Sequence, residues 1–228
     1  MDELRENANG LEALFEFEKG KCAGILNGID NEVWNPSTDT YIENRFTVKT
    51  VTKGKEQNKK ILCDQFGLDI TKPLFVFIGR LVGEKAADIL PDAIRTAIYQ
   101  TQGNACFLIL GSGETSIEWE LQQMTNEYQG IYNAYIGYNE QLSHLIYAGA
   151  DFLLMPSRVE PCGLNQMYAM RYGTVPVVRS TGGLKDTVTD MGDTDGFGIR
   201  FNNATIDDLA YSIGRGVSVY QDKKHMEW

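Results

Sequence analysis

The residues best suited to chemistry lie between positions 151 and 188. Glu160 stands directly before Pro161-Cys162-Gly163, where a helix is expected to begin after the apolar run 152–155. Unpaired backbone N–H groups at the first turn of a helix bind hydroxyl groups or anions. A carboxylate there can hold sugar hydroxyls or stabilise positive charge developing at an anomeric carbon. A plainer interpretation, an acidic residue at a helix N-terminus, fits Glu160 equally well.

Two cations follow another apolar run, at positions 75–78. Arg80 comes two residues after the run, and Lys85 lies five residues further on. The guanidinium is a planar fork that matches phosphate oxygens, and the ammonium is a compact charge, so together they suit a diphosphate. The alternative is that Glu84 pairs with either cation in an ordinary surface ion pair.

Glycines and an aromatic residue follow three further apolar runs. Gly111-Ser112-Gly113-Glu114 is a turn whose backbone amides can approach an anion, and Thr181-Gly182-Gly183 permits an equally close approach. The ring of Tyr138 can stack on a nucleobase. Each has a structural alternative: a tight turn for the two glycine segments and partial burial on the next helix for Tyr138.

The cysteines and histidines indicate no metal site. The four cysteines are widely spaced without a CxxC pair, and there are two histidines. Three of the cysteines have apolar or helical neighbours, so we expect reduced core residues in a reducing cytoplasm. Cys162 has no histidine near it in sequence, which argues against a thiol nucleophile. We expect His144 to cap a helix or pair locally.

Short apolar runs alternate with segments of helical periodicity. Such runs, bounded by glycine, proline or polar residues, are typical of strands buried on both faces of a parallel sheet. Thr205 is the expected N-cap of the last helix. The pattern predicts a doubly wound, Rossmann-like α/β sheet with the polar junctions at one edge. The expected strands are 75–78, 106–110, 134–136, 152–155 and 175–178, and the expected helices are 85–100, 115–128, 141–148, 164–172 and 209–219.

Charge and hydropathy exclude several partners. A net charge of −10 over 228 residues disfavours nucleic acid and anionic membranes, because both are themselves negatively charged. No apolar run is long enough to cross a bilayer, and the polar N-terminus, MDELRENANG, does not resemble a signal peptide. The lysine-rich stretch 49–60 is expected to be a solvated linker or helix face. The end of the chain at 225–228 carries no helix-stop signal, which is typical of a piece of a longer protein.

These residues together resemble the bacterial glycogen synthase and plant starch synthase family, retaining glycosyltransferases built from two Rossmann-like domains (the GT-B architecture). The resemblance runs from about Lys21 to Val188. The matching blocks are Gly24-Ile25-Leu26-Asn27-Gly28-Ile29-Asp30, Trp34-Asn35-Pro36, Gly54-Lys55, Asn58-Lys59, Gly79-Arg80-Leu81 with Lys85, Gly111-Ser112-Gly113-Glu114, Ile136-Gly137-Tyr138, Tyr147-Ala148-Gly149-Ala150-Asp151, Met155-Pro156-Ser157-Arg158, Glu160-Pro161-Cys162-Gly163-Leu164, Tyr172-Gly173-Thr174, Thr181-Gly182-Gly183-Leu184 and Asp186-Thr187-Val188.

The resemblance implies a role for each matching residue. Arg80 and Lys85 would bind the donor diphosphate, with Gly79 beside them, and Tyr138 would stack on the adenine of ADP-glucose. Glu160 would hold the transferred glucose. The remaining donor-binding positions would be the backbone amides of Cys162, Gly163 and Leu164 around the glucose and Thr181, Gly182 and Gly183 near the diphosphate or nucleotide. The family reaction moves glucose to the non-reducing 4-hydroxyl of an α-1,4-glucan with retention, without a cofactor or metal.

The chain departs from the family in three ways. The family usually has Gln-Lys-Gly where this sequence reads Glu84-Lys85-Ala86, which places a carboxylate beside the diphosphate lysine. Tyr168 stands where related transferases carry a second glutamate, as is usual in the glycogen synthase branch. Only the donor-binding half is recognisable. We expect residues 1–48 to lead from an acceptor domain, 49–228 to form the Rossmann-like domain, and 21–228 to be one structural unit.

Three functions stay open at this point. The first is the donor-binding domain of a glycogen or starch synthase, which alone would bind ADP-glucose or ADP weakly and catalyse no transfer. The second is another retaining transferase, of the sucrose-phosphate or trehalose-phosphate type. The third is a non-catalytic module that binds glucan or nucleotide. A stacking tyrosine accepts adenine or uracil, so ADP-glucose and UDP-glucose both remain possible donors.

Overall fold

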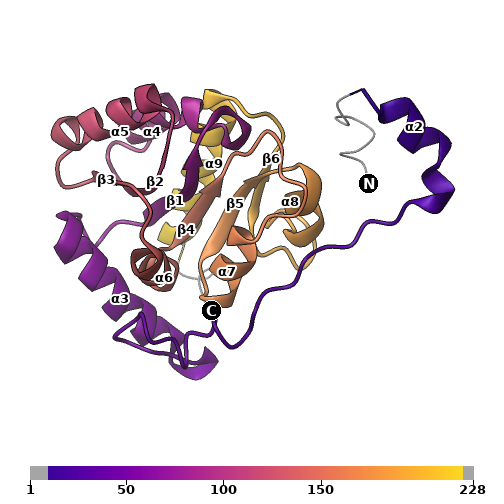
Figure 1. Ribbon diagram of the computed structural model, residues 1–228. Coiled ribbons are helices and arrows are strands. Elements are labelled where there is room, and N and C mark those ends of the chain that lie inside the picture. Colours follow the sequence, from indigo (N-terminus) through magenta and orange to yellow (C-terminus); the bar gives the residue numbers. More distant parts are fainter. Residues whose placement is uncertain (1–9, 223–228) are drawn as a thin grey trace.

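The computed structural model describes residues 10–222, and its centre is a parallel sheet of six strands in the order β3-β2-β1-β4-β5-β6 (Figure 1). The predicted fold class, a doubly wound Rossmann-like sheet, is confirmed. The chain leaves β1 in one direction to form β2 and β3, then returns to place β4 on its other side. In such folds, ligands usually bind at the carboxyl ends of the strands beside this reversal, here β1 and β4. The strands are β1 (Leu74–Leu81), β2 (Cys106–Gly113), β3 (Tyr132–Ile136), β4 (Phe152–Met155), β5 (Val175–Arg179) and β6 (Ile199–Phe201).

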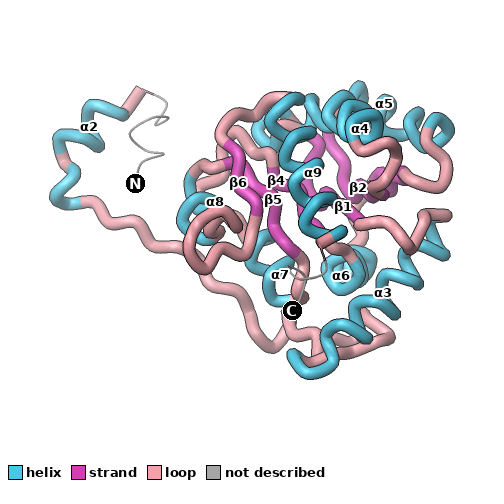
Figure 2. The backbone as a smooth tube through the Cα atoms, turned by 180° about the vertical axis from the view of Figure 1, so that it is seen from behind, coloured by secondary structure: helices cyan, strands magenta, loops and turns pink. Residues whose placement is uncertain are grey.

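Helices cover both faces of the sheet (Figure 2). On one face α4 (Leu90–Gln100), α5 (Thr115–Glu127) and α9 (Ile206–Gln221) share a hydrophobic core with the strands. The opposite face carries the other helices, whose buried side chains form a second core. These are α3 (Val51–Phe66), α6 (Glu140–Gly149), α7 (Asn165–Arg171) and α8 (Gly182–Thr187).

The strand β1 shows why its sequence is apolar without alternation. Phe75 and Phe77 pack into the core below α4 and α9, whereas Leu74 and Val76 pack into the core below α3 and α6. Successive side chains point to opposite faces, so a strand covered on both faces must be apolar at every position. The five predicted strands are all present. The strand β6 was missed because it is three residues long and Arg200 interrupts its apolar pattern.

The helix predicted over 85–100 begins later than expected. Two short 3-10 turns, Gly83–Lys85 and Ala87–Ile89, come before α4. Ala86 separates them with a left-handed backbone, at a φ of 52°. Side chains make this conformation costly, so it interrupts an α-helix, and it is the position at which the resembling family usually has glycine. Pro91 lies in the first turn of α4, where the missing backbone N–H costs no hydrogen bond.

The lysine-rich stretch 49–60 starts helix α3, but it is not uniformly solvated as expected. Lys59 donates a 2.7 Å hydrogen bond to Asp151 from a nearly buried position. Lys55 donates to the Thr174 hydroxyl at 2.8 Å, and its burial lowers the pKa of its ammonium to about 7. The acceptors come from residues about a hundred positions later, so the local charge pattern could not reveal them.

The N-terminal segment forms an arm that reaches away from the sheet (Figures 1 and 2). It contains α2 (Glu12–Phe17) and a 3-10 turn (Lys19–Lys21), and Phe17 on it is 84% exposed. The chain then returns to the domain, where Ile42 and Phe46 join the core below α3. A 3-10 turn (Val48–Thr50) leads into α3. The expectations for the first nine residues and for 225–228 lie outside the described residues.

Candidate functional site

A cavity of about 340 Å³ lies at the carboxyl edge of the sheet, where the sequence predicts that the polar junctions meet. Gly79 and Arg80 at the end of β1, Gly111 at the end of β2 and Tyr138 after β3 contribute to its wall. Parallel strands direct their carboxyl ends to the same edge, which brings together residues almost sixty positions apart. The predicted clustering of these junctions is therefore confirmed.

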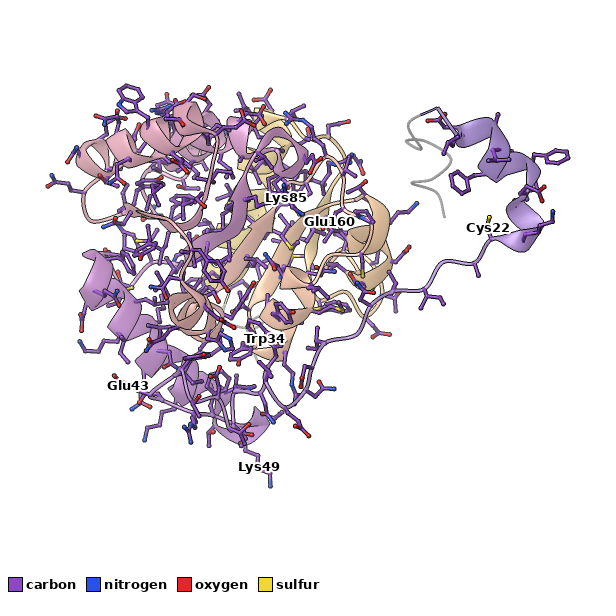
Figure 3. The ribbon with its side chains drawn as sticks, in the orientation of Figure 1. Cys22, Trp34, Glu43, Lys49, Lys85 and Glu160 are labelled. Carbon is purple, nitrogen blue, oxygen red and sulfur yellow. The ribbon has the colours of Figure 1, made fainter. Side chains whose placement is uncertain are left out.

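Lys85 and Glu160 form an ion pair beside this cavity (Figure 3). The lysine Nζ donates to Glu160 Oε2 at 2.5 Å, and the Ser157 hydroxyl donates to the same oxygen at 3.0 Å. Lys85 stands on the turn after β1 and Glu160 on the loop after β4, and β1 and β4 are paired neighbours. The carboxylate is buried, with 7% of Glu160 exposed, so the loop and its partners hold it in place.

Arg80 extends from the end of β1 into an ion pair with Glu84. The distance from Arg80 Nη2 to Glu84 Oε2 is 3.0 Å, and both side chains are 66% exposed. The alternative interpretation, a surface ion pair with Glu84, therefore describes Arg80 as it stands here. Lys85 differs, because its partner is Glu160. An exposed pair is weak in water, so Arg80 can exchange its partner at small cost.

The helix predicted over 164–172 is present as α7, but Pro161-Cys162-Gly163, where the helix was also expected to begin, lies in the loop before it. The helix begins at Asn165, and Cys162 and Gly163 precede it in a turn. Gly163 has a φ of 73°, and the Gln166 side-chain amide donates to the carbonyls of Cys162 and Gly163 at 3.1 and 3.2 Å. A left-handed residue inside this turn displaces the helix by three residues from Cys162, because the chain cannot be α-helical there. Leu164 is the half-exposed residue that comes directly before α7.

The segment Thr181-Gly182-Gly183 is not the turn that was expected. Thr181 stands at the N-cap position of α8, and the two glycines form the first turn of this helix. Gly183 N donates to the Glu160 carbonyl at 3.0 Å, and a Cβ at Gly183 would collide with the Cys162 backbone. This segment therefore supports the loop that carries Glu160. Among the predicted site residues that the structure describes, Gly79, Arg80 and Tyr138 line the cavity, whereas Lys85, Glu160 and residues 181–183 do not.

Tyr138 lies at the rim with its ring in solvent. It is 83% exposed, and its hydroxyl is 3.5 Å from Glu140 Oε2. The alternative of partial burial against the following helix is wrong, because most of the ring is in solvent although α6 begins only two residues later. An exposed ring beside a cavity offers its face to a flat ligand.

An aromatic wall opposite the strand ends was not predicted. We define it as Trp34, Tyr168 and Tyr147, which all line the cavity. The ring of Trp34 stacks between Tyr168, at a centroid distance of 3.7 Å, and His144, at 4.0 Å (Figure 3 labels Trp34). The sequence signal was the block Trp34-Asn35-Pro36, which belongs to the resemblance but suggested no role.

Buried hydrogen bonds around Asp39 support the aromatic wall through His144, on which the Trp34 ring stacks. Asp39 Oδ2 accepts from the Tyr172 hydroxyl at 2.5 Å and lies 2.7 Å from His144 Nδ1. Burial opposes ionisation of Asp39, but the bonds with His144 and Tyr172 outweigh it, and the pKa of this carboxyl is lowered. The expected local role of His144 is wrong, since its partner Asp39 is 105 residues away.

The cysteines agree only in part with expectation. Cys63 and Cys106 are buried, whereas Cys22 and Cys162 are partly exposed, and all four are free thiols. Cys22 differs because the arm that carries it stands away from the core (Figure 3). The Cys162 sulfur accepts a 3.2 Å hydrogen bond from Asn27 N, which connects the returning arm to the loop of Glu160.

Within residues 10–222 no three His, Cys, Asp or Glu side chains are placed to hold a metal ion together. In the same part of the chain, no helix combines the length and the apolar character needed to span a membrane.

Comparison with known proteins identifies the family. The model of the family "Glycosyl transferases group 1" matches residues 72–217. The chain is 56% identical to a glycogen synthase of Flavobacterium johnsoniae, over 98% of this chain and 47% of that protein. It is 45% identical to a glycogen synthase of Rhodospirillum rubrum, over 94% of this chain and 44% of that protein.

A solved structure gives the same result. The catalytic domain of starch synthase IV from Arabidopsis thaliana, bound to ADP and acarbose, superposes with a TM-score of 0.85 at 38% identity. The match covers 96% of this chain and 46% of that one, so the chain spans about half the length of the relatives that it matches. With a Rossmann-like sheet, a strand-end site and a family match over most of its length, the chain belongs to the glycosyl transferases group 1 family.

Proposed function

We propose that this chain is the donor-binding half of a glycogen or starch synthase. The whole protein would transfer glucose from ADP-glucose to the non-reducing 4-hydroxyl of an α-1,4-glucan with retention. The observation that carries the proposal is the arrangement at the edge of the sheet. The exposed ring of Tyr138, the exposed guanidinium of Arg80 and the partly buried Lys85–Glu160 pair all lie close to the carboxyl ends of the strands.

The chemistry of these groups suits a nucleotide sugar. Transfer breaks the bond between the anomeric carbon and a diphosphate oxygen, and the bonding electrons leave with ADP. Negative charge therefore increases on the diphosphate, where the cations of Arg80 and Lys85 stabilise it. The Glu160 carboxylate accepts hydrogen bonds from glucose hydroxyls, and the ring of Tyr138 stacks on the base.

Lys85 has a second role under this proposal. Its ammonium partly neutralises Glu160 before the donor arrives, at an Nζ–Oε2 distance of 2.5 Å. A buried carboxylate is costly without such a partner. The same ammonium would attract the diphosphate, so Lys85 would interact both with Glu160 and with the donor. The cations supply the positive charge that the departing diphosphate needs, and we therefore propose a reaction without a metal or other cofactor.

The donor that we propose is ADP-glucose. Support comes from the relatives named glycogen synthase and from the starch synthase IV structure, which holds ADP. The second half of the protein would be the acceptor domain that binds the glucan, in a protein of the cytoplasm. This chain alone is expected to bind ADP weakly without catalysing transfer, because transfer requires both substrates in a closed, water-excluding cleft.

Calorimetric titration of the chain with ADP tests the proposal. We expect Arg80→Ala to weaken ADP binding about tenfold or more, because charge-assisted hydrogen bonds to phosphate are lost. Equal binding by the variant would contradict the role of Arg80. Glucan capture without nucleotide affinity would instead indicate a non-catalytic module. Transfer to a sugar phosphate by the full-length protein would indicate the sucrose-phosphate or trehalose-phosphate type, and turnover by this chain alone would contradict its inactivity.

A further inference from the structure

The two cations proposed to bind the diphosphate, Arg80 and Lys85, both form ion pairs with carboxylates of the chain itself. Arg80 Nη2 lies 3.0 Å from Glu84 Oε2, and Lys85 Nζ lies 2.5 Å from Glu160 Oε2. The turn between these cations is engaged as well, since Gly83 N donates to a Glu114 carboxylate oxygen at 3.1 Å. An incoming diphosphate therefore competes with groups of the same charge and the same hydrogen-bonding type.

The carboxylates differ in how firmly they are held. The Glu160 side chain is 9% exposed, whereas the Glu84 side chain is 66% exposed. Exposed ion pairs gain little in water, so the Glu84 carboxylate can leave Arg80 easily. Glu160 sits under its own loop with Ser157 bonded to it. Glu84 is thus the carboxylate that a ligand can displace.

The backbone of Glu84 keeps that carboxylate close to the site after it has been displaced. Its carbonyl accepts hydrogen bonds from Arg158 N at 2.8 Å and from Val159 N at 3.3 Å. These bonds fix the turn of Glu84 to the loop that leads to Glu160. The side chain can rotate, but its backbone is fixed beside Lys85 and on the turn that follows Arg80, so its charge stays near both cations.

We propose that Glu84 is an internal competitor of the donor diphosphate: it pairs with the Arg80 guanidinium that the diphosphate would bind, and it lowers the affinity for nucleoside diphosphates. This inference rests on the proposed function and names the residue that sets the strength of donor binding. The chain carries a carboxylate where its resembling family usually has the neutral, nearly isosteric glutamine. With a glutamate at this position, the site would bind nucleoside diphosphates more weakly than with glutamine, and ADP, the product of transfer, would dissociate more easily.

Glu84→Gln tests the inference, because it removes the charge while keeping the length of the side chain. We expect ADP to bind about three- to tenfold more tightly, since one negative charge near the diphosphate is lost. Adenosine should bind equally to both proteins, because it lacks the diphosphate. The difference for ADP should decrease as salt is raised from about 0.02 M to about 0.5 M, since salt screens exposed charges.

Asp64→Asn is the matched control. Asp64 forms an ion pair of the same i,i+4 spacing with Lys60, at 2.6 Å, and the two side chains are 64% and 67% exposed. Asp64 lies four residues before Leu68, which forms a β-bridge with Gly130. Gly130 comes just before the start of β3, so Asp64 is at the amino ends of the strands, opposite the proposed site at their carboxyl ends. Its loss should leave ADP affinity unchanged at every salt concentration.

The two hypotheses fail in different ways. Equal or weaker ADP binding by Glu84→Gln, with normal binding by the wild type, overturns the competitor role and leaves the proposed function intact. A gain that adenosine shares also overturns it, because the effect would then not involve the diphosphate. An absence of ADP binding in wild type and variants alike overturns both.

Discussion

The two sides of the cavity are built in opposite ways. The side at the strand ends presents two exposed groups, Arg80 at the end of β1 and Tyr138 in the loop after β3. The aromatic wall is fixed instead by a buried system in which Asp39 bonds to His144 and Tyr172. The comparison indicates different roles: the exposed side can exchange its partners for a ligand, whereas we expect the wall to keep its shape when a ligand binds, because buried hydrogen bonds and stacked rings hold it.

The largest effect is expected from the buried system behind the wall. Asp39→Ala leaves the His144 ring nitrogen and the Tyr172 hydroxyl without their buried partner. We expect the free energy of unfolding to fall by about 3 kcal/mol, because buried polar groups that lose a partner carry their full desolvation cost. Urea unfolding measures the change. Glu43→Ala, an exposed carboxylate of the same segment (Figure 3), is the control and should change the stability little.

The same residue should give the wall a pH dependence. The pKa of Asp39 is lowered in the folded protein, so its stabilisation is present above the unfolded pKa of about 4 and is lost as the pH falls through the folded value. The difference in stability between wild type and Asp39→Ala should therefore shrink on acidification below about pH 4. A constant difference at all acidic pH values would show that Asp39 does not contribute through its charge.

Trp34→Ala should have an intermediate effect on two properties at once. Removing the ring leaves Tyr168 and His144 without their stacking partner, so we expect a stability loss of about 2 kcal/mol. ADP binding should weaken about fivefold, since the cavity loses part of its wall. Trp119→Ala, on α5 and 65% exposed, is the matched control. A loss of affinity without any loss of stability would contradict the view that the wall is a rigid support.

Tyr138→Ala should affect binding alone. The ring is 83% exposed, so the free energy of unfolding should change by less than about 0.5 kcal/mol. ADP affinity should fall about fivefold or more, because stacking of a base on an aromatic ring is worth about 1–3 kcal/mol. Tyr138→Phe keeps the ring and should bind normally. Unchanged binding by the alanine variant would place the base elsewhere in the cavity.

The local sequence pattern predicts the side of the cavity at the strand ends, but not the aromatic wall. The apolar runs indicate a parallel sheet, and a parallel sheet brings Arg80, Lys85, Tyr138 and Glu160 to one edge without further information. The aromatic wall depends on Asp39 meeting His144 and Tyr172, which are 105 and 133 residues away. No pattern within a helix or strand contains such a pairing.

The other departures have similar causes. The sequence suggests solvated side chains for Lys55 and Lys59 because their buried acceptors, Thr174 and Asp151, come from distant loops that lead into β5 and β4. The segment 181–183 suggested a ligand-binding turn because glycine permits close backbone approach. Here the close approach at Gly183 is to the backbone of Cys162 rather than to the cavity. Glycine content indicates that something lies close, but it does not indicate what.

The strand order has a consequence for how this site can evolve. The chain forms β2 and β3 as an excursion, from 82 to 151, before it returns to β1 as β4. Under the proposed function, most of the base-binding side is encoded inside that excursion, while the glucose carboxylate is encoded after it. Lys85 lies at the very start of the excursion, and the pairing of β1 with β4 brings the turn that carries it next to the loop of Glu160. Under that proposal, selectivity for the base and selectivity for the sugar would reside largely in separate stretches of the gene, and mutation could alter one while the other is conserved.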